Sequence, residues 1–375
     1  MPSSLYLTLL VGPMVPLPAP KPVIDALTSI TVTTSASGRS GFQLSFTLAD
    51  QSILQALFLL APPGVELRVV IMVTVNGIPQ VLMDGVMREH DVHPSAGTAG
   101  STMTITGEDL TAAMDLIQMN GVPAGLSPDL SVLTILARYA MYGVIPQVLP
   151  PLIPDIQIPV ERLPSQEGTD YAYISQLAQL VGYVFYIDPG PLPGVSRAYW
   201  GPQIKFGVPQ PALTVNMDTW TNVEQLTFRY APYKATTPVV TIQDQTTGVP
   251  IPVPIPPVTP LNPPLGIYVP TPLRIEQASS VANKDPGLAL LQGMARASAA
   301  ADVVTGSGSL DVLHYGSVLQ ARQLVGVRGA GPAFDGLHYV DSVTHTLSRG
   351  QFKQSFTLTR NALVSNTPAV PAIGL

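Results

Sequence analysis

Hydrophobic and polar residues alternate with a period of two along much of the first hundred residues, and this alternation predicts β-strands. One turn is especially clear, because Asn76 and Gly77 both tolerate the positive φ angles of a tight hairpin. A short helix is expected at 51–60. With an opening strand at the N-terminus, the pattern predicts a β-rich module over 1–107, whose strands are the two halves of 28–49 and the segments 65–75, 78–93 and 101–106.

The spacing then changes to that of helices. Thr106 with Asp109 resembles a capping box that would open a helix at 108–117. Ser127 followed by Pro128 predicts the start of a second helix. Its expected buried face comprises Leu130, Leu133, Leu136, Ala137 and Ala140.

A third helix is expected to begin near Thr169-Asp170 and to end at Gly182, followed by a buried strand at 183–187. Proline-rich residues 146–164 are expected to be extended. Together these elements predict a mixed α/β insert over 108–205.

The last part of the chain returns to strands. A second β-rich module is expected over 206–231 and 273–361, with a helix at 285–301 and a tail at 362–375. Residues 232–272 interrupt this module and are rich in proline, which removes backbone donors, so they are expected to form an extended arm. The final strands are expected at 318–328, 334–347 and 352–360.

Four landmarks recur in the same order in the two β-rich modules, which indicates an internal duplication. Residues 30–49 resemble 213–231. The matching landmarks are Gln43-Leu44-Ser45-Phe46 with Gln225-Leu226-Thr227-Phe228, Asp84-Gly85 with Asp335-Gly336, Val92 with Val343, and Met103-Thr104-Ile105-Thr106 with Phe356-Thr357-Leu358-Thr359.

Two stretches resemble the phage late control D family, the central baseplate hubs of contractile phage tails and related contractile injection systems. The first runs from Thr169-Asp170-Tyr171 through Gly182-Tyr183-Val184-Phe185 to Trp200-Gly201. The second comprises Leu324-Val325-Gly326-Val327-Arg328-Gly329, Phe334-Asp335-Gly336-Leu337-His338-Tyr339-Val340, Val343-Thr344-His345 and Gln354-Ser355-Phe356-Thr357-Leu358.

The resemblance implies a mainly β protein with an α/β insert, in which two tube-like antiparallel β-barrel modules accompany a smaller mixed domain. It implies a homotrimer that adapts a six-fold tail tube to a three-fold spike. The implied partners are the tube-initiator protein, a separate spike protein and baseplate wedge proteins, with DNA or cargo passing through the lumen. The spike is expected to be a separate protein because the tail after 361 is short. The expected place is a virion or phage-tail-like particle, assembled in the bacterial cytoplasm.

Composition fits a protein whose surface is covered by partners. Of 375 residues, only 11% are charged while 46% are hydrophobic, and the net charge of -6 with no basic run argues against a dedicated nucleic-acid binder. There is no cysteine, which excludes thiolate chemistry. The N-terminal segment lacks a basic start and is expected to be a strand and a proline-stiffened arm rather than a signal peptide, and no membrane insertion is expected.

Candidate catalytic groups are few, and no catalytic residue, cofactor or metal site is predicted. His90 and His93 superficially resemble a metal pair, but residues three apart on a strand point to opposite faces. A Ser/His/Asp catalytic set could include His345, but the sequence contains no G-x-S-x-G nucleophile elbow. Residues 326–331 lack the lysine and helix of a phosphate loop, so a turn is expected there.

Two further features are expected to be structural. The aromatic cluster of Tyr183, Phe185 and Tyr186 favours a packed core. Asp84 and Asp335, each followed by glycine, are expected at turns or strand starts.

Two other functions remain open at this stage. One is a tail-associated enzyme that degrades cell-wall polymer, which would need a carboxylate pair that no spacing singles out. The other is a tail-tube or adhesin-like binding protein, although a tube subunit would need only one module.

Overall fold

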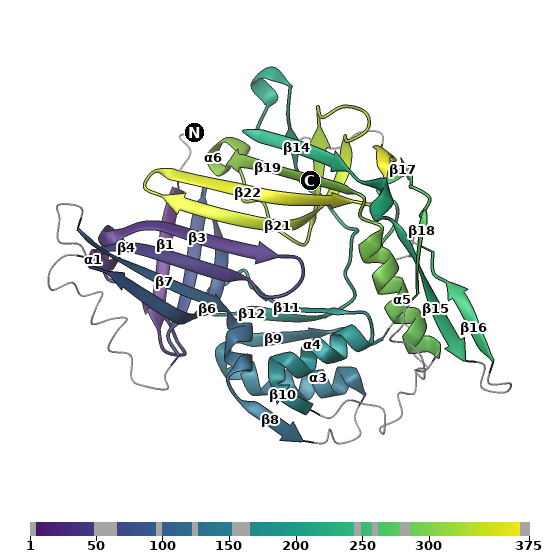
Figure 1. Cartoon of the computed structure of the whole chain (residues 1–375). Coiled ribbons are helices and arrows are strands. Elements are labelled where there is room, and N and C mark those ends of the chain that lie inside the picture. Colours follow the sequence, from purple (N-terminus) through teal and green to yellow (C-terminus); the bar gives the residue numbers. More distant parts are fainter. Residues whose placement is uncertain are drawn as a thin grey trace.

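The computed structural model describes residues 5–48, 66–94, 100–121, 127–151, 166–243, 249–256, 262–277 and 286–367. Its main feature is a 13-stranded sheet that receives strands from both ends of the chain (Figure 1). The mainly β fold with a few helices is therefore confirmed. The helix expected at 51–60 lies outside the described residues.

The N-terminal part of this sheet contains six main strands. They are β1 (Leu5–Gly12), β3 (Leu27–Ser35), β4 (Gly41–Leu48), β5 (Arg68–Val75), β6 (Ile78–His93) and β7 (Ser101–Asp109). Short elements β2 (Leu17–Pro18) and α1 (Lys21–Ala26) join β1 to β3. The predicted hairpin at Asn76-Gly77 is confirmed, with φ angles of 51° and 83°.

The C-terminal part contributes a second set of six. They are β13 (Gln210–Thr214), β14 (Gln225–Tyr230), β19 (Val304–Asp311), β20 (Leu324–Arg328), β21 (Gly336–Ser348) and β22 (Gln351–Arg360). The strand expected at 318–328 is shorter than predicted, because residues 318–323 form a loop after the short helix α6 (Val312–Tyr315).

The two sets have the same strand order, which supports the duplication read from the sequence. The first runs β3-β4-β7-β6-β5-β1 and the second β14-β19-β22-β21-β20-β13, and both follow the same order along the chain. Neighbours are antiparallel throughout, except that β13 runs parallel to β20. In both sets the longest strand changes register against its hairpin partner, once between β6 and β7 and once between β21 and β22.

Three of the four sequence landmarks lie at equivalent places, and one does not. Val92 pairs with Met103 as Val343 pairs with Phe356. The match of 43–46 with 225–228 was wrong, because the first segment lies in β4, the second strand of its set, and the second lies in β14, the first strand of its set. Polar and apolar residues alternate in the same way in both segments. A match of four residues therefore could not show which strand of a set each segment belongs to.

The two sets join edge to edge. The C-terminal half of β21 pairs antiparallel with β3 over Ser342–Ser348 and Ser29–Ser35. No closed barrel is found among the described strands, so the two barrels that the resemblance implied are replaced by one extended sheet. A single buried apolar cluster draws side chains from both sets, including Leu44, Phe46, Phe356 and Leu358, and each fully buried side chain of this kind contributes about 1.5–3 kcal/mol.

The insert forms its own layer beside the sheet (Figure 1). In chain order it contains η1 (Leu110–Asp115), β8 (Gln118–Gly121), α3 (Pro128–Leu136), η2 (Ala137–Tyr142), β9 (Val144–Val148), β10 (Gln166–Thr169), α4 (Asp170–Leu180), β11 (Val184–Pro189) and β12 (Ser196–Gly201). Strands β9, β12 and β11 make a small sheet packed with α3 and α4 around Trp200. The domain boundaries at 107 and 205 stay predictions.

Two details of the predicted insert were wrong. The helix expected at 108–117 is the short 3-10 helix η1, and its cap is Asp109, whose carboxylate accepts from the Thr111 backbone N–H. Helix α3 does start after Ser127, and Leu136 is buried as expected. The other four residues of the expected face are exposed, and Val132 and Ile135 are buried beside Leu136 instead. The expected residues and the buried residues both recur at helical spacing. Periodicity alone therefore could not show which face of the helix is buried.

The proline-rich segment is paired rather than loop-like. Strand β15 (Thr236–Gln243) lies between β16 (Pro250–Pro254) and β18 (Arg274–Gln277), and α5 (Pro286–Ala300) packs on it. The described parts of 232–272 thus include paired strands as well as loop, and the three prolines of β16 stand on an edge strand, where proline is tolerated. Short elements η4 (Asp218–Trp220), η5 (Pro232–Lys234), β17 (Gly266–Tyr268) and β23 (Leu363–Ser365) complete the described chain.

Candidate functional site

One face of the large sheet is covered by small hydroxyl and amide side chains. Alternation in each strand sends apolar residues to the core and polar residues to the other side. Strand pairing places these polar residues next to one another across seven neighbouring strands, from β14 to β7. The hydroxyl face, as we name it, comprises Gln225, Thr227, Thr305, Ser307, Ser309, Ser355, Thr357, Thr359, Ser342, Thr344, Thr346, Ser348, Ser29, Thr31, Thr33, Gln43, Ser45, Thr47, Thr102, Thr104 and Thr106.

The hydroxyl face crosses the junction between the two strand sets without interruption. At that junction the hydroxyls of Thr33 and Thr344 lie 3.2 Å apart. Near the far edge, the hydroxyls of Thr227 and Ser307 lie 2.9 Å apart. Each such cross-strand pair contributes about 0.2–1 kcal/mol, and threonine also suits the solvent-facing positions of strands.

Few charges interrupt this face. Lys353 and Glu224 form an exposed ion pair at 2.6 Å. Glu89 and Asp91, which pair with Thr106 and Thr104, place two carboxylates at the β6 edge, while Arg229 lies at the β14 edge. A hollow of about 540 Å³ on this face is lined by Thr31, Thr33, Gly41, Phe42, Gln43, Arg88, Glu89, Thr106, Gly107 and Glu108.

Replacing both Thr33 and Thr344 with valine is expected to change the free energy of unfolding by less than about 1 kcal/mol, because these hydroxyls face solvent and valine suits a strand. Val32 offers a matched control, since its side chain is fully buried and Val32→Thr is expected to cost about 1–3 kcal/mol. Urea denaturation measures both. A large loss for the double valine variant would mean that the hydroxyl face is retained for stability.

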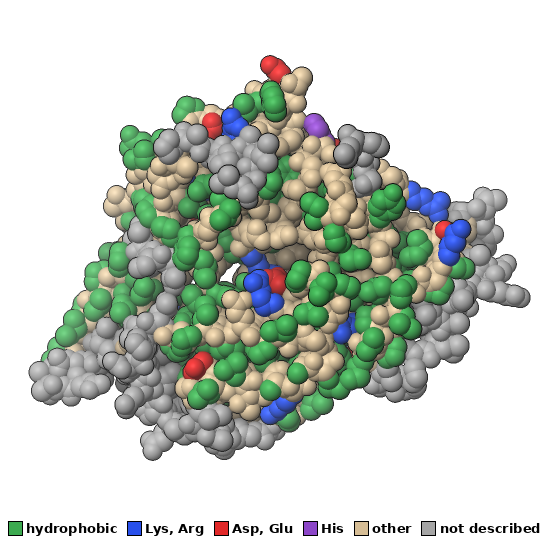
Figure 2. Space-filling view, turned by 180° about the vertical axis from the view of Figure 1, so that it is seen from behind, with side chains coloured by type: hydrophobic (Ala, Val, Ile, Leu, Met, Phe, Trp, Pro, Cys, Tyr) green, Lys and Arg blue, Asp and Glu red, His purple; other side chains and the backbone are tan. Residues whose placement is uncertain are grey.

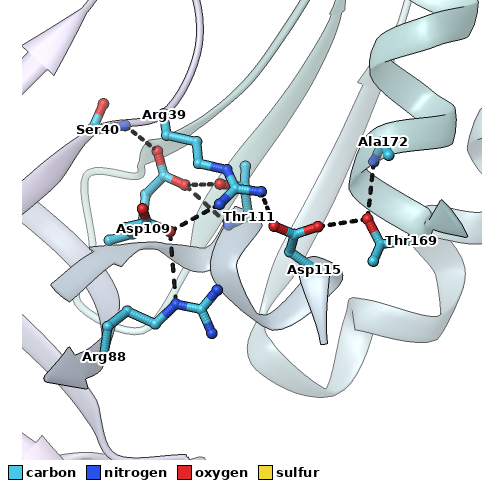
Figure 3. A network of polar contacts seen from close by, with 9 residues as sticks. Arg39, Ser40, Arg88, Asp109, Thr111, Asp115, Thr169 and Ala172 are labelled. Atoms are coloured by element: carbon cyan, nitrogen blue, oxygen red, sulfur yellow. Dashed lines mark hydrogen bonds and ion pairs between the residues drawn. The ribbon is translucent and has the colours of Figure 1, made fainter. Parts of the chain in front are cut away.

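A polar network fastens the sheet to the insert (Figure 3). Arg39 donates to Glu108 at 3.0 Å and also to Asp115. Asp115 accepts from the Thr169 hydroxyl at 2.5 Å, and that hydroxyl caps α4 by accepting from the Ala172 N–H. The arginine therefore connects the turn after β3 to the start of α4.

The pKa values of the two aspartates in this network shift in opposite directions. Burial raises the pKa of Asp109, whose carboxylate accepts from the Ser40 N–H at 2.6 Å and from Thr111. Burial alone would also raise the pKa of Asp115, but hydrogen bonds from Thr169 and Arg39 outweigh it and hold that pKa below its usual value. Asp115 is therefore stabilised in its charged form.

The stability difference between the wild type and Asp115→Asn is expected to be largest near pH 7 and to shrink below about pH 4. A carboxyl group whose pKa is lowered by folding stabilises the native state above its unfolded pKa of about 3.9, and this contribution is lost as pH falls through the folded value. Thermal unfolding of both proteins between pH 3 and pH 7 measures the difference. A constant difference over this range would contradict the network.

Buried ion pairs make further connections between the sheet and the insert. Arg68 donates twice to Asp84, with both distances 2.7 Å, and the Ser196 hydroxyl of the insert donates to the same carboxylate at 3.0 Å. Arg322 donates to Asp188 and stacks over the Tyr186 ring at 3.8 Å. These contacts fix the insert against both strand sets.

The structure shows where each histidine considered in the sequence analysis lies. His90 and His93 are exposed and their partners, Ile105 and Thr102, lie on opposite faces, as strand parity predicted. His345 is buried beside Gln354 at 3.0 Å, and burial lowers its pKa to about 4. Among the described residues, no group of three or more potential metal-binding side chains converges.

Of the turn expected at 326–331, residues 326–328 are the end of strand β20, and the connection to β21 begins at Gly329. Asp335 accepts from the Ala330 N–H at 2.8 Å, as expected of a turn residue. Asp84 was expected at a turn or strand start but lies inside β6 in its buried ion pair.

The aromatic cluster packs as predicted. Tyr183 meets Trp200 edge-on at 4.9 Å, Tyr186 stacks on Tyr199 at 5.0 Å, and Phe185 is buried.

Sequence reasoning did not find the hydroxyl face. Its signal was present in the alternation of Thr102, Thr104 and Thr106 with buried residues and in the same alternation at Ser355, Thr357 and Thr359. Strand pairing was needed to show that these rows lie side by side.

Apolar side chains are common on the surface, as the low charge content predicted. Figure 2 shows many hydrophobic side chains and few charged ones on the side opposite to the view of Figure 1. Trp220 and Tyr233 are each more than three-quarters exposed, at 76% and 77%. Within the described ranges, no helix is long and apolar enough to cross a membrane.

Comparison with solved structures finds the same architecture in tail proteins. A tail protein from Neisseria meningitidis MC58 superposes with a TM-score of 0.58 at 13% identity, covering 96% of this chain and 98% of the other. The 43 kDa tail protein of prophage MuSo2 from Shewanella oneidensis gives 0.57 at 16% identity, covering 96% and 100%. The chain has the fold of these tail proteins.

A chain in the Francisella PdpA–VgrG complex also superposes, with a TM-score of 0.60 at 10% identity over 98% of this chain and 60% of that one. No protein-family model and no curated protein sequence matches the chain. The likeness to tail and secretion proteins therefore rests on the fold, which most of the chain shares.

Proposed function

We propose that this protein is a structural baseplate hub of a contractile tail or related injection system, and that it acts by assembly rather than by catalysis. In this proposal it forms a homotrimer that adapts a six-fold tail tube to a three-fold spike. The tube-initiator protein, a separate spike protein and baseplate wedge proteins are its partners. The particle is a virion or a phage-tail-like structure.

The repeated strand set is the observation that carries the proposal. Each chain has two sets of strands in the same order, and therefore two similar units. Three chains would then supply six similar units around one axis, which meets a six-fold tube on one side and a three-fold spike on the other. A tube subunit or adhesin would not need the second set.

The hydroxyl face supports a passage through the assembly. A surface made mainly of serine and threonine, with few charges, offers no row of cations to hold phosphate groups and no apolar patch to hold protein. In the proposed ring this face lines the lumen, so that DNA or cargo slides without specific binding. The exposed apolar residues elsewhere, including Trp220 and Tyr233, fit burial against partner proteins.

The fold comparisons give independent support. Two neighbours are tail proteins, and another belongs to a complex that contains VgrG. For this chain we infer the corresponding place in a tail or secretion machine.

Light scattering of the purified protein tests the proposal. A hub is expected to give a mass of three times 39.6 kDa, alone or together with tube or spike protein. A chain that stays monomeric with both partners present would contradict it. Release of fragments from purified cell wall would favour the enzyme instead.

A further inference from the structure

The small sheet beside α5 has one edge that is apolar and uncharged. Strand β16 lies at the outer side of this sheet, and β15 is the only described strand that pairs with it (Figure 1). Ile251, Val253 and Ile255 alternate along the segment, and residues 249–256 include no charged side chain. Valine and isoleucine favour strands, and an uncharged apolar edge is a template for pairing with another chain. The apolar composition of this edge therefore favours association between chains.

The remaining positions of the same edge are prolines, and the backbone pairing shows which way they face. The Ile255 N–H donates to the Pro238 carbonyl of β15 at 2.9 Å. In an antiparallel ladder, successive residues direct their backbone groups alternately to one side and to the other. The residues two and four positions before Ile255 therefore also face β15. Pro250, Pro252 and Pro254 lie between them, at the positions whose N–H groups would point away from β15.

A strand that approached the free side of β16 would meet carbonyl oxygens and no donors. Proline has no N–H, so Pro250, Pro252 and Pro254 remove every hydrogen bond that these three outward positions would donate. The carbonyl groups of the approaching strand would be buried without donors, which is unfavourable. The proline row therefore opposes the association that the apolar residues favour.

The opposite edge of the same sheet has a different composition. Strand β18 contains no proline, and its residues Arg274 and Glu276 are exposed. Charged side chains are another means by which proteins keep strand edges from pairing. The sheet thus carries charges on one edge and prolines on the edge that lacks charge.

We propose that Pro250, Pro252 and Pro254 keep β16 from pairing with β16 of a second copy of this chain. The prolines are then retained because they prevent association at this edge. The inference does not depend on the proposed trimer, because it concerns a contact that the wild-type protein does not make. It is tested against the wild-type mass, whether that mass is of one chain or of three.

The triple variant Pro250→Thr, Pro252→Thr and Pro254→Thr tests the proposal, because threonine favours strands and restores the three donors. Sedimentation velocity compares its mass with that of the wild type over a range of protein concentrations. The variant is expected to form species of about twice the wild-type mass or more as the concentration rises, since open edges pair with one another. A variant that keeps its strand content by circular dichroism and stays at the wild-type mass would overturn the proposal.

Two matched variants separate edge pairing from the loss of proline rigidity. Pro270→Thr with Pro272→Thr changes two prolines that precede β18 and lie outside the described strands, so the wild-type mass is expected. Lysine in place of Pro250, Pro252 and Pro254 restores the N–H groups but adds charge to the edge, so no increase in mass is expected. An increase equal to that of the threonine variant in either case would overturn the proposal.

Hydrogen exchange locates the contact within the associated protein. The new backbone amides at 250, 252 and 254 are expected to be protected in the associated threonine variant and to lose this protection on dilution. Association that leaves these amides unprotected would place the contact elsewhere and overturn the proposal. If the triple variant does not fold, Pro252→Thr alone opens the centre of the edge and is measured in the same way, with the same expected and contradicting results.

Discussion

Replacing Arg68 with methionine is expected to lower the free energy of unfolding by about 3–5 kcal/mol. The side chains of Arg68 and Asp84 are almost completely buried, at 4% and 0% exposure, and they share two hydrogen bonds of 2.7 Å. Without the guanidinium, the Asp84 carboxylate stays buried with only the Ser196 hydroxyl as a described donor. Urea denaturation followed by circular dichroism measures the loss.

The double variant Arg68→Met with Asp84→Leu is expected to be more stable than Arg68→Met alone, because it removes the unpaired charge together with its partner. Lys353→Met provides an exposed control. Lys353 pairs with Glu224, and both are about 40% exposed, so its loss is expected to cost less than about 1 kcal/mol. Equal losses for Arg68→Met and Lys353→Met would show that burial of the Arg68 pair contributes nothing.

Truncating either of two equivalent core residues is expected to destabilise the whole sheet. Met103 and Phe356 occupy corresponding positions in the two strand sets, and both side chains belong to one buried cluster. Met103→Ala is expected to cost about 2–5 kcal/mol and Phe356→Ala about 3–5 kcal/mol, from lost burial and the cavity left behind. Because the cluster joins the two sets, unfolding of the sheet is expected to stay a single transition in each variant.

Thermal unfolding followed by near-ultraviolet circular dichroism and by calorimetry checks this expectation. Val92→Ala is a suitable control, since Val92 pairs with Met103 but is 39% exposed, and its truncation is expected to have a small effect. Two separated sheet transitions in Phe356→Ala, with one unchanged from the wild type, would show that the two sets fold independently.

The sequence predicted the strands that have strong alternation and clear turns. The hairpin of β5 and β6 is an example, because Asn76-Gly77 determines both its position and its register. The helix from Asp170 was predicted for a similar reason, since Thr169 supplies a recognisable cap. Local signals of this kind do not depend on the rest of the fold.

Strand β19 was missed because its residues disfavour strands in isolation. Its core-facing positions include Gly306 and Gly308. A Cβ atom on Gly306 would lie 2.7 Å from the Phe228 ring, and one on Gly308 would lie 2.4 Å from the Gln225 carbonyl oxygen. The glycines are therefore required by neighbours far away in the sequence, which propensity does not include.

The hydroxyl face also combines a local signal with contacts between residues that are distant in the sequence. Alternating threonines could be read from the sequence, but the continuous hydroxyl face follows from the pairing of β3 with β21, strands that lie more than 300 residues apart. The proposed function therefore rests on sheet topology rather than on a short motif.

Electron microscopy of the assembled protein, viewed down its symmetry axis, shows directly whether three chains form a ring. A hub is expected to have a three-fold axis, six similar units around a hollow centre, and the hydroxyl face turned toward that centre. An assembly without a three-fold axis, or one with the hydroxyl face on its outer surface, would contradict it.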